Sequence, residues 1–333
     1  MILVTGATGH IGNVLVRKLL AAGESVRVLI FPGEDTLPLK DLLLEMVTGD
    51  VLDPLSLRKA MQGVTRVFHL AGIISILPGR SRIVNRVNFE GTKNVIAEAR
   101  QAGVQRLIYT SSIHAIRRVP QGVRIDERLP FDPENTAGEY DRSKAQASLA
   151  VLEAARQGLD SVILCPTGVI GPNDYRRSEL GQLILDCVEH KTQFYVDGAY
   201  DFVDVRDVAD GIMNAADKGR SGETYILSGE KLTVRRIIDI LWDLTGRRFA
   251  RIHIPFSVAR FAARYTPFYY RRKRMKPRFT SYSLETLRSN SDISHDKATA
   301  ELGYHPRSLK ESITDTVEWF RKNRKAVLST ISG

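Results

Sequence analysis

The chain has 333 residues, of which 43% are hydrophobic, and its formal net charge is +10 at pH 7. Its length allows one large core or two closely joined ones, and its composition excludes a disordered or collagen-like chain. Its apolar runs are too short to cross a bilayer and its two cysteines lack metal-ligand spacing, so we expect a cytoplasmic protein without a metal site.

Six short apolar runs in the first half of the chain predict strands. They are near-continuous rather than alternating, as expected for parallel strands covered on both faces. Helical stretches lie between them; in the first, Ile11, Leu15 and Leu19 recur every four residues before Gly23 caps the helix. The predicted strands are Ile2–Thr5, Val26–Ile30, Met46–Thr48, Val67–Leu70, Leu107–Ser111 and Val162–Cys165. This alternation predicts an α/β fold with a doubly wound parallel sheet of the Rossmann type.

The rhythm of strands and helices changes after Pro166. Residues 172–200 carry no clear strand, and helical patterns follow over Val234–Leu244 and Leu309–Phe320. We expect the later part of the chain to fold over the carboxyl edge of the sheet, where ligands bind in open α/β sheets. The predicted division is a dinucleotide-binding core of residues 1–171 with a strand near 203–229, and a smaller substrate-binding region of residues 172–202 and 230–333.

A glycine-rich turn follows the first strand directly and begins the first helix. Gly6, Gly9 and Gly12 are spaced G-x-x-G-x-x-G. Such a turn needs a residue with positive φ, close backbone approach to a pyrophosphate and tight packing of helix on strand. The free N–H groups of the helix start also favour an anion. The residues predicted to bind a dinucleotide here are Gly6, Thr8, Gly9, His10, Ile11 and Gly12.

A tyrosine and a lysine lie four residues apart in a predicted helix, as Tyr140 and Lys144. Residues at this spacing share one helix face. A free tyrosine has a pKa of about 10, and a nearby ammonium group is expected to lower it toward the working range of a base. Ser111 and Ser112, about thirty residues upstream, end the fifth predicted strand; serine pairs at such positions also cap turns, and that interpretation stays open.

The order and spacing of these motifs resemble the extended branch of the short-chain dehydrogenase/reductase family, the NAD-dependent epimerase/dehydratase superfamily. The pattern after the sixth strand is closest to its dihydroflavonol-reductase-like and 3β-hydroxysteroid-dehydrogenase-like members. The resemblance extends from residue 2 to about residue 323. Further matching segments are Val87–Val95, Pro166–Pro172, Val203–Ala209 and Glu301–Pro306.

The resemblance implies a catalytic set of Ser112, Tyr140 and Lys144. Ser112, or less favourably Ser111, would hold the substrate oxygen, Tyr140 would pass the proton, and Lys144 would tune Tyr140 and bind the nicotinamide ribose. Asn88 would bind backbone, join a proton relay or serve as a structural amide. The other implied cofactor contacts are Asp50 and Val51 on the adenine, Leu70, Ala71 and Gly72 along the middle, and Pro166, Thr167 and Val169 near the nicotinamide. Asp50 has a competing interpretation as a turn or helix cap.

The end of the second strand decides which dinucleotide binds. An acidic residue there binds the ribose diol of NAD, whereas an arginine accepts the 2′-phosphate of NADP. Phe31 at this position does neither, but Glu34 and Asp35 lie close by and would repel a phosphate. The sequence therefore favours NAD and leaves NADP open.

Three functions compete for this family pattern. A reductase of a bulky apolar ketone or secondary alcohol, dihydroflavonol-, steroid- or CoA-ester-like, is favoured because the diphosphate anchors of nucleotide-sugar enzymes are missing. Cys165, Gly168 and Tyr200 stand where those anchors are expected, and a buried diphosphate without donors is costly. The alternatives are a nucleotide-sugar epimerase or dehydratase that uses bound NAD, and a non-catalytic dinucleotide sensor. His114, near the serines, is expected in the pocket wall.

Positive charge and aromatic residues gather in the segment 265–278. Three interpretations stay open for it: a solvated surface loop, an entrance that attracts an anionic substrate, or a weak contact with an anionic membrane surface. We expect no nucleic-acid partner, because no nucleic-acid-binding module accompanies the segment. The expected partners are a small-molecule substrate and, as in other family members, a second copy of the chain in a homodimer.

Overall fold

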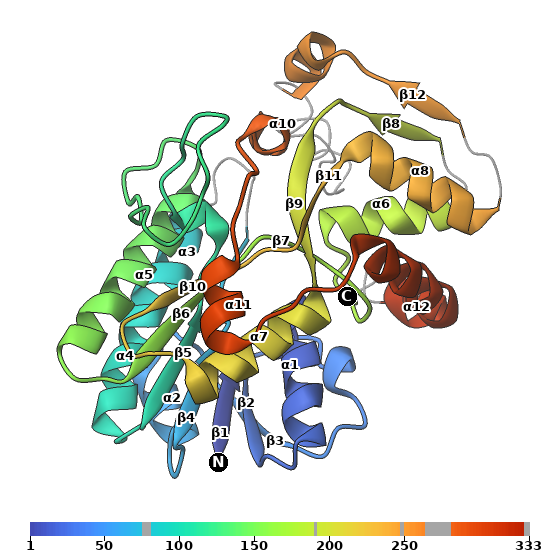
Figure 1. Ribbon diagram of the computed structural model, residues 1–333. Coiled ribbons are helices and arrows are strands. Elements are labelled where there is room, and N and C mark those ends of the chain that lie inside the picture. Colours follow the sequence, from blue (N-terminus) through green and yellow to red (C-terminus); the bar gives the residue numbers. More distant parts are fainter. Residues whose placement is uncertain (75–80, 190–191, 247–249, 264–280, 330–333) are drawn as a thin grey trace.

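A seven-stranded parallel sheet forms the centre of the computed structural model (Figure 1), which describes residues 1–74, 81–189, 192–246, 250–263 and 281–329. The strand order is β10-β6-β5-β4-β1-β2-β3. The strands are β1 (Ile2–Thr5), β2 (Val26–Ile30), β3 (Glu45–Thr48), β4 (Arg66–His69), β5 (Arg106–Thr110), β6 (Ser161–Pro166) and β10 (Thr224–Leu227). The chain reverses its direction of winding between β1 and β4, which opens a ligand crevice beyond their carboxyl ends. The predicted Rossmann-type fold is confirmed.

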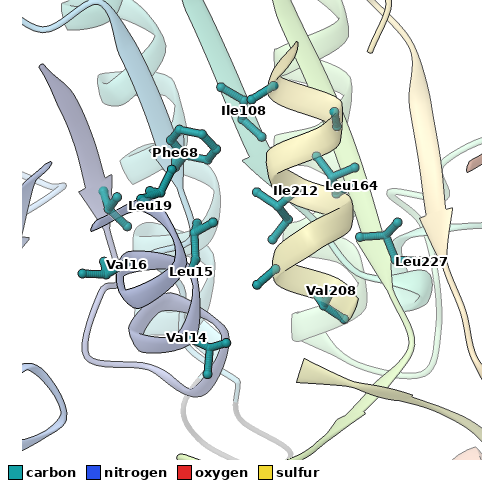
Figure 2. Close-up of a cluster of buried hydrophobic side chains, with 14 of the residues drawn as sticks. Val14, Leu15, Val16, Leu19, Phe68, Ile108, Leu164, Val208, Ile212 and Leu227 are labelled. Carbon is teal, nitrogen blue, oxygen red and sulfur yellow. The ribbon is translucent and has the colours of Figure 1, made fainter. Parts of the chain in front are cut away.

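Helices cover both faces of this sheet. On one face pack α1 (His10–Ala21), α7 (Val205–Lys218) and α11 (Asp296–Leu302), and on the other α2 (Pro54–Ala60), α4 (Gly91–Gln101) and α5 (Glu139–Arg156). Figure 2 shows Leu15 and Leu19 of α1 beside Phe68 of the sheet, the stripe that the four-residue spacing predicts. Ile212 of α7 lies on the same face. Burial of each such side chain stabilises the fold by roughly 1.5–3 kcal/mol. This packing holds the strands, and so the residues at their ends, in place.

A separate apolar cluster holds the helices α6 (Glu179–Val188), α8 (Val234–Thr245) and α12 (Leu309–Ser329) together. Beside it, β9 (Ala199–Asp204) lies between β7 (Gly168–Ile170) and β11 (Glu230–Thr233), and β8 (Gln193–Tyr195) pairs with β12 (Arg251–His253). Further elements are α3 (Ser81–Asn85), α10 (Ser281–Arg288) and the short helices η1 (Leu37–Leu39), η2 (Arg86–Glu90) and η3 (Ile113–Ala115).

The later part of the chain tests three predictions. The helices expected near residues 234–244 and 309–320 are present as α8 and α12. The expectation of no strand in residues 172–200 is wrong, because β8 lies there and β9 begins at Ala199. β8 has only three residues and pairs with β12, far along the chain. The local sequence therefore carries no pattern that predicts it.

The predicted division at residue 171 stays a proposal. Residues assigned to the C-terminal region, such as Leu302 and Tyr304, pack into the core beneath α7. The basic aromatic segment 265–278 lies outside the described residues, and the homodimer also stays a prediction. Across the described parts of the chain, no helix combines the length and the apolar character needed to span a membrane.

Candidate active site

The glycine turn forms a cradle at the carboxyl end of β1. Gly6 has a φ of +73°, and a Cβ added to it would lie 2.7 Å from the backbone nitrogen of Ala71 and from the carbonyl carbon of Leu70. A Cβ on Gly12 would overlap the carbonyl oxygen of Gly6. Gly9 is the N-cap of α1 and makes no side-chain cap hydrogen bond. The backbone is therefore exposed at the helix start, and these residues fit a dinucleotide pyrophosphate.

A carboxylate occupies the end of β2, next to this cradle. Glu34 accepts hydrogen bonds from the hydroxyl of Thr8, at 2.6 Å, and from the backbone nitrogen of Phe31, at 3.2 Å. Arg176 donates to the same Thr8 hydroxyl at 2.6 Å and forms an ion pair with Glu34. The side chain of Phe31 is 54% exposed. Glu34, rather than Phe31, therefore supplies the polar group at this position.

The residues predicted to contact the adenine, Asp50 and Val51, lie in a tight turn after β3. The Asp50 carboxylate accepts a hydrogen bond from the backbone nitrogen of Leu52, at 2.9 Å, while its own backbone nitrogen donates to Ser56. The turn interpretation of Asp50 is thus observed, and its contact with an adenine stays a prediction. Val51 is buried, and its carbonyl accepts a hydrogen bond from Asn94.

Asn88 joins the segment after β4 to α5. Its side chain accepts from the backbone nitrogen of Ile73, at 2.7 Å, and donates to the Ile73 carbonyl and to the Ser143 hydroxyl. A Cβ on Gly72 would lie 3.1 Å from the Asn88 oxygen and 3.5 Å from the Lys144 ammonium nitrogen. Of the roles considered for Asn88, backbone binding is the one visible in the structure, and it brings Gly72 beside Lys144.

The two serines at the end of β5 have different surroundings. The Ser111 hydroxyl is hydrogen-bonded to Ser148 at 2.7 Å, inside the core between β5 and α5. Ser112 lies next to Tyr140 and acts to lower the pKa of this phenol. It also accepts from the backbone nitrogen of His114, at 3.2 Å, as the cap of η3. Ser112 is therefore the serine that faces Tyr140.

Burial governs the protonation of Tyr140, which is 8% exposed in the first turn of α5. Burial raises the pKa of Tyr140 to about 12, against the opposing effect of Ser112, and the nearby charge of Asp141 raises it further. Burial therefore outweighs any lowering of this pKa, and the tuning of Tyr140 by Lys144 stays a prediction. The ammonium nitrogen of Lys144 donates to the Thr110 carbonyl oxygen at 2.8 Å, and burial lowers the pKa of Lys144 to about 8.

The residues expected near the nicotinamide lie where β6 ends and β7 begins. Pro166 closes β6 and Val169 is the middle residue of β7. The buried Thr167 donates its backbone N–H to the Leu227 carbonyl at 3.2 Å. These side chains lie beyond the same sheet edge as the glycine cradle, Ser112 and Lys144. The residues predicted for the cofactor and the reaction therefore follow one edge of the sheet, and their contacts with a cofactor stay predictions.

Comparisons with known proteins agree with this arrangement. The model of the NAD dependent epimerase/dehydratase family matches residues 2–228. The chain belongs to this family. It is 39% identical to sterol demethylase protein B of Methylococcus capsulatus, over 96% of this chain and 98% of that protein. It is 33% identical to a putative dihydroflavonol 4-reductase of Synechocystis, over 96% and 94% of the two chains. The solved structure of gox2253 superposes with a TM-score of 0.84 at 33% identity, over 97% and 98% of the two chains.

Membership of the epimerase/dehydratase family makes this chain an enzyme of oxidoreductive chemistry that acts on small molecules. The resemblance to extended short-chain dehydrogenases/reductases is confirmed, including its closeness to reductase-like members. Within the described ranges, no group of three His, Cys, Asp or Glu side chains is arranged to hold a metal ion.

Sequence reasoning missed a polar cluster beside Tyr140, which we call the Asp141 cluster. The Asp141 carboxylate is fully buried, and it accepts hydrogen bonds from the Tyr282 hydroxyl, at 2.7 Å, and from Arg118, at 3.1 Å. Nδ1 of His114 lies 4.0 Å from the same carboxylate, and its Nε2 is 3.0 Å from the Tyr200 hydroxyl. The cluster thus ties the first turn of α5 to α10 and β9.

The protonation of His114 follows from this position. Burial lowers the pKa of His114, the carboxylate of Asp141 opposes the shift, and the charge of Arg118 reinforces it. A neutral imidazole stacked on Tyr200, with ring centroids 5.8 Å apart, forms part of the wall next to Tyr140. The one signal in the sequence was the place of Asp141 inside the Y-x-x-x-K motif, next to Tyr140.

Proposed function

We propose that this enzyme is an NAD-dependent oxidoreductase that interconverts a ketone and a secondary alcohol on a bulky apolar substrate, dihydroflavonol-, steroid- or CoA-ester-like. The observation that carries the proposal is the placement of three buried groups together: Tyr140 in the first turn of α5, Lys144 one helical turn away beside Gly72, and Ser112 close enough to act on the pKa of Tyr140. Relatives named as reductases, with similarity over nearly the whole chain, support the same reaction type.

The protonation states favour reduction of a ketone at neutral pH. A bound nicotinamide supplies the hydride in this direction. Tyr140, with a pKa raised to about 12, carries its proton at neutral pH and is set to donate it to the substrate oxygen. Ser112 would hold that oxygen by its hydroxyl, and the buried Lys144 would fix the ribose near the Thr110 carbonyl. Oxidation of an alcohol would require Tyr140 to lose its proton first, so it should become faster as pH rises.

The nucleotide-sugar alternative lacks polar anchors at the positions the family uses for a diphosphate. Cys165 is fully buried in β6, Gly168 has no side chain, and the Tyr200 hydroxyl is engaged by His114. Burying a diphosphate without compensating donors is unfavourable. These features support the reductase over the epimerase or dehydratase.

Glu34 supports NAD rather than NADP as the cofactor. Its carboxylate lies against Thr8 of the glycine turn, where the adenosine ribose of a dinucleotide is expected. A carboxylate accepts hydrogen bonds from a ribose diol and repels a 2′-phosphate. Arg176, which donates to the Thr8 hydroxyl, is already paired with Glu34.

One experiment tests the reaction and the cofactor together. NADH and NADPH binding is measured by cofactor fluorescence, and cofactor oxidation is then followed over a panel of ketosteroids, flavanones and 3-oxoacyl thioesters. We expect tighter binding of NADH and net oxidation with at least one apolar ketone. Conversion of a nucleotide sugar without net cofactor consumption would replace the reductase by the epimerase or dehydratase, and absence of binding of either dinucleotide would refute both.

A further inference from the structure

A cavity of about 660 Å³ opens next to the Asp141 cluster. Three segments far apart in the sequence supply its walls: residues 113–125, residues 256–260 and residues 285–293, with Tyr200 of β9 between them. This volume lies within the range of about 300–1,000 Å³ that is common for small-molecule sites. We call it the arginine-lined cavity, for reasons given below.

The inner wall of the arginine-lined cavity is apolar. Ile113, Ile116 and Ile125 line it, and each is less than a tenth exposed. Ile293 and Phe256 face them from the C-terminal segments. Moving an apolar ligand from water onto such a surface is favourable by about 25 cal/mol for each Å² of apolar area buried.

The remaining wall carries an excess of positive charge. Arg117, Arg118, Arg260 and Arg288 line the cavity with a single acidic residue, Glu285. Arg118 is committed to the buried carboxylate of the Asp141 cluster. Within the described parts of the chain, the other three arginines have no ion-pair partner. The guanidinium of Arg288 lies 4.2 Å from the ring centroid of Phe256, so charge and apolar surface meet at one place.

The arginine-lined cavity adjoins the catalytic tyrosine. His114 lines the cavity, and its ring centroid is 6.3 Å from that of Tyr140. Tyr200 also lines the cavity and stacks on the same imidazole. A molecule bound against His114 and Tyr200 is therefore one side chain away from Tyr140.

We propose that the arginine-lined cavity binds the substrate and that the substrate is an amphiphilic acid. Its apolar body would pack on the isoleucine wall, and its anionic group, a carboxylate or a phosphate, would pair with Arg117 and Arg288. Arginine suits this role because its planar guanidinium binds both oxygens of such a group. The inference deepens the proposed reductase function and rests on it for the identity of the reacting ketone.

Matched probes test the charge requirement directly. A pyrene-labelled long-chain fatty acid, its methyl ester and the alkyl phosphate of the same chain are titrated by fluorescence into the wild type and into the double variant Arg117→Gln/Arg288→Gln. We expect the acid to bind the wild type about tenfold more tightly than the ester, or more, the scale of a charge-assisted hydrogen bond. The double variant should lose this preference. Arg156→Gln, on the exposed surface of α5, is the matched control and should keep it.

Each result decides the question. Equal binding of acid and ester to the wild type, or a preference that survives in a double variant with unchanged melting temperature, would overturn the proposal. So would displacement of the acid probe by UDP-glucose at lower concentration than by the unlabelled fatty acid. If the phosphate binds more tightly than the carboxylate, the anionic group is a phosphate. NADH binding is measured separately, because its absence would remove the reductase function without changing the comparison of acid with ester.

Discussion

The glycine turn and the arginine-lined cavity both lie beyond the carboxyl ends of the central strands, but the chain builds them in opposite ways. The turn consists of seven consecutive residues, Gly6 to Gly12, and its shape follows from the absence of side chains at close backbone contacts. The cavity takes its walls from three segments, of which the first, residues 113–125, lies more than a hundred residues before the other two. One region is specified locally and the other by long-range packing.

This difference follows from what the two kinds of site require. A cradle for a pyrophosphate needs only backbone N–H groups and space, which the local sequence supplies. A substrate site needs particular side chains brought together by tertiary structure. Tyr140 lies between the two regions: Lys144 and Gly72 lie on the side of the proposed cofactor site, and the Asp141 cluster lies on the side of the arginine-lined cavity.

Removing the Tyr140 hydroxyl tests the point where the two regions meet, and we expect the largest effect there. Tyr140→Phe should lower kcat for ketone reduction by about 10²- to 10⁴-fold, because the proton donor is lost. NADH affinity should stay near that of the wild type, since the glycine turn is untouched. Steady-state kinetics and cofactor fluorescence measure the two quantities.

Tyr225→Phe is the matched control for this change. It deletes a hydroxyl of the same kind in β10, where that group bonds to Glu301. This variant should keep kcat. Full turnover by Tyr140→Phe with its fold intact would exclude Tyr140 as the proton donor.

Asp201, next to Tyr200 in β9, tests the assembled region through the pH dependence of stability. Burial raises the pKa of Asp201 from its ordinary value to about 6, although the carboxylate accepts a hydrogen bond from the Gly229 backbone at 3.0 Å. Between about pH 4 and pH 6 the folded chain therefore binds more protons than the unfolded chain. Its stability falls as pH rises through this window, by about 3 kcal/mol in total from Asp201.

Asp201→Asn should remove this contribution, because an amide keeps the acceptor for Gly229 and does not ionise. The free energy of unfolding of the variant relative to the wild type should rise from about pH 4 to pH 6 and then stay level. Chemical denaturation at intervals across that range measures the difference. Parallel profiles for the two proteins would show that Asp201 has an ordinary pKa.

Gly12 tests the locally specified region. A Cβ there would overlap the Gly6 carbonyl oxygen, whereas a Cβ on Gly9 would lie 3.2 Å from the same atom. Gly12→Ala should lower the free energy of unfolding by about 1–3 kcal/mol, the usual cost of overpacking, and weaken NADH binding. Gly9→Ala, the matched control, should have a smaller effect on both. Denaturant titration measures stability and cofactor fluorescence measures NADH binding. A larger effect of Gly9→Ala than of Gly12→Ala would contradict the described turn.

The sequence predicts the locally specified region well. The six expected strands match β1 to β6 to within about one residue at most ends, because each is a continuous apolar run bounded by turns. The glycine turn occurs at the predicted place, and Ser112, Tyr140 and Lys144 do gather at one edge. The order of parallel strands explains this, because it places the carboxyl ends of successive strands, and the residues that follow them, side by side.

The assembled region could not be predicted in the same way. Asp141 looks like a polar helix residue, and only the folded chain reveals that Tyr282 and Arg118 enclose it. The spacing of Tyr140 and Lys144 is correct, but spacing gives no information about burial, which dominates the pKa of both groups. A short strand such as β8 depends on a partner almost sixty residues away.

Glu34 offers the finest test, because it is a single side chain that adds specificity to the local cradle. In Glu34→Gln the charge that repels a 2′-phosphate is gone, and Arg176 loses its ion-pair partner within reach of Thr8. The ratio of NADPH to NADH affinity should therefore rise by about tenfold, which corresponds to about 1.4 kcal/mol. Cofactor fluorescence measures both constants. Asp35→Gln, whose carboxylate accepts from the Leu37 backbone nitrogen instead, is the control and should leave the ratio unchanged. If Glu34→Gln also leaves it unchanged, then cofactor choice is set by side chains outside the turn, and even this part of the site would belong to the assembled region.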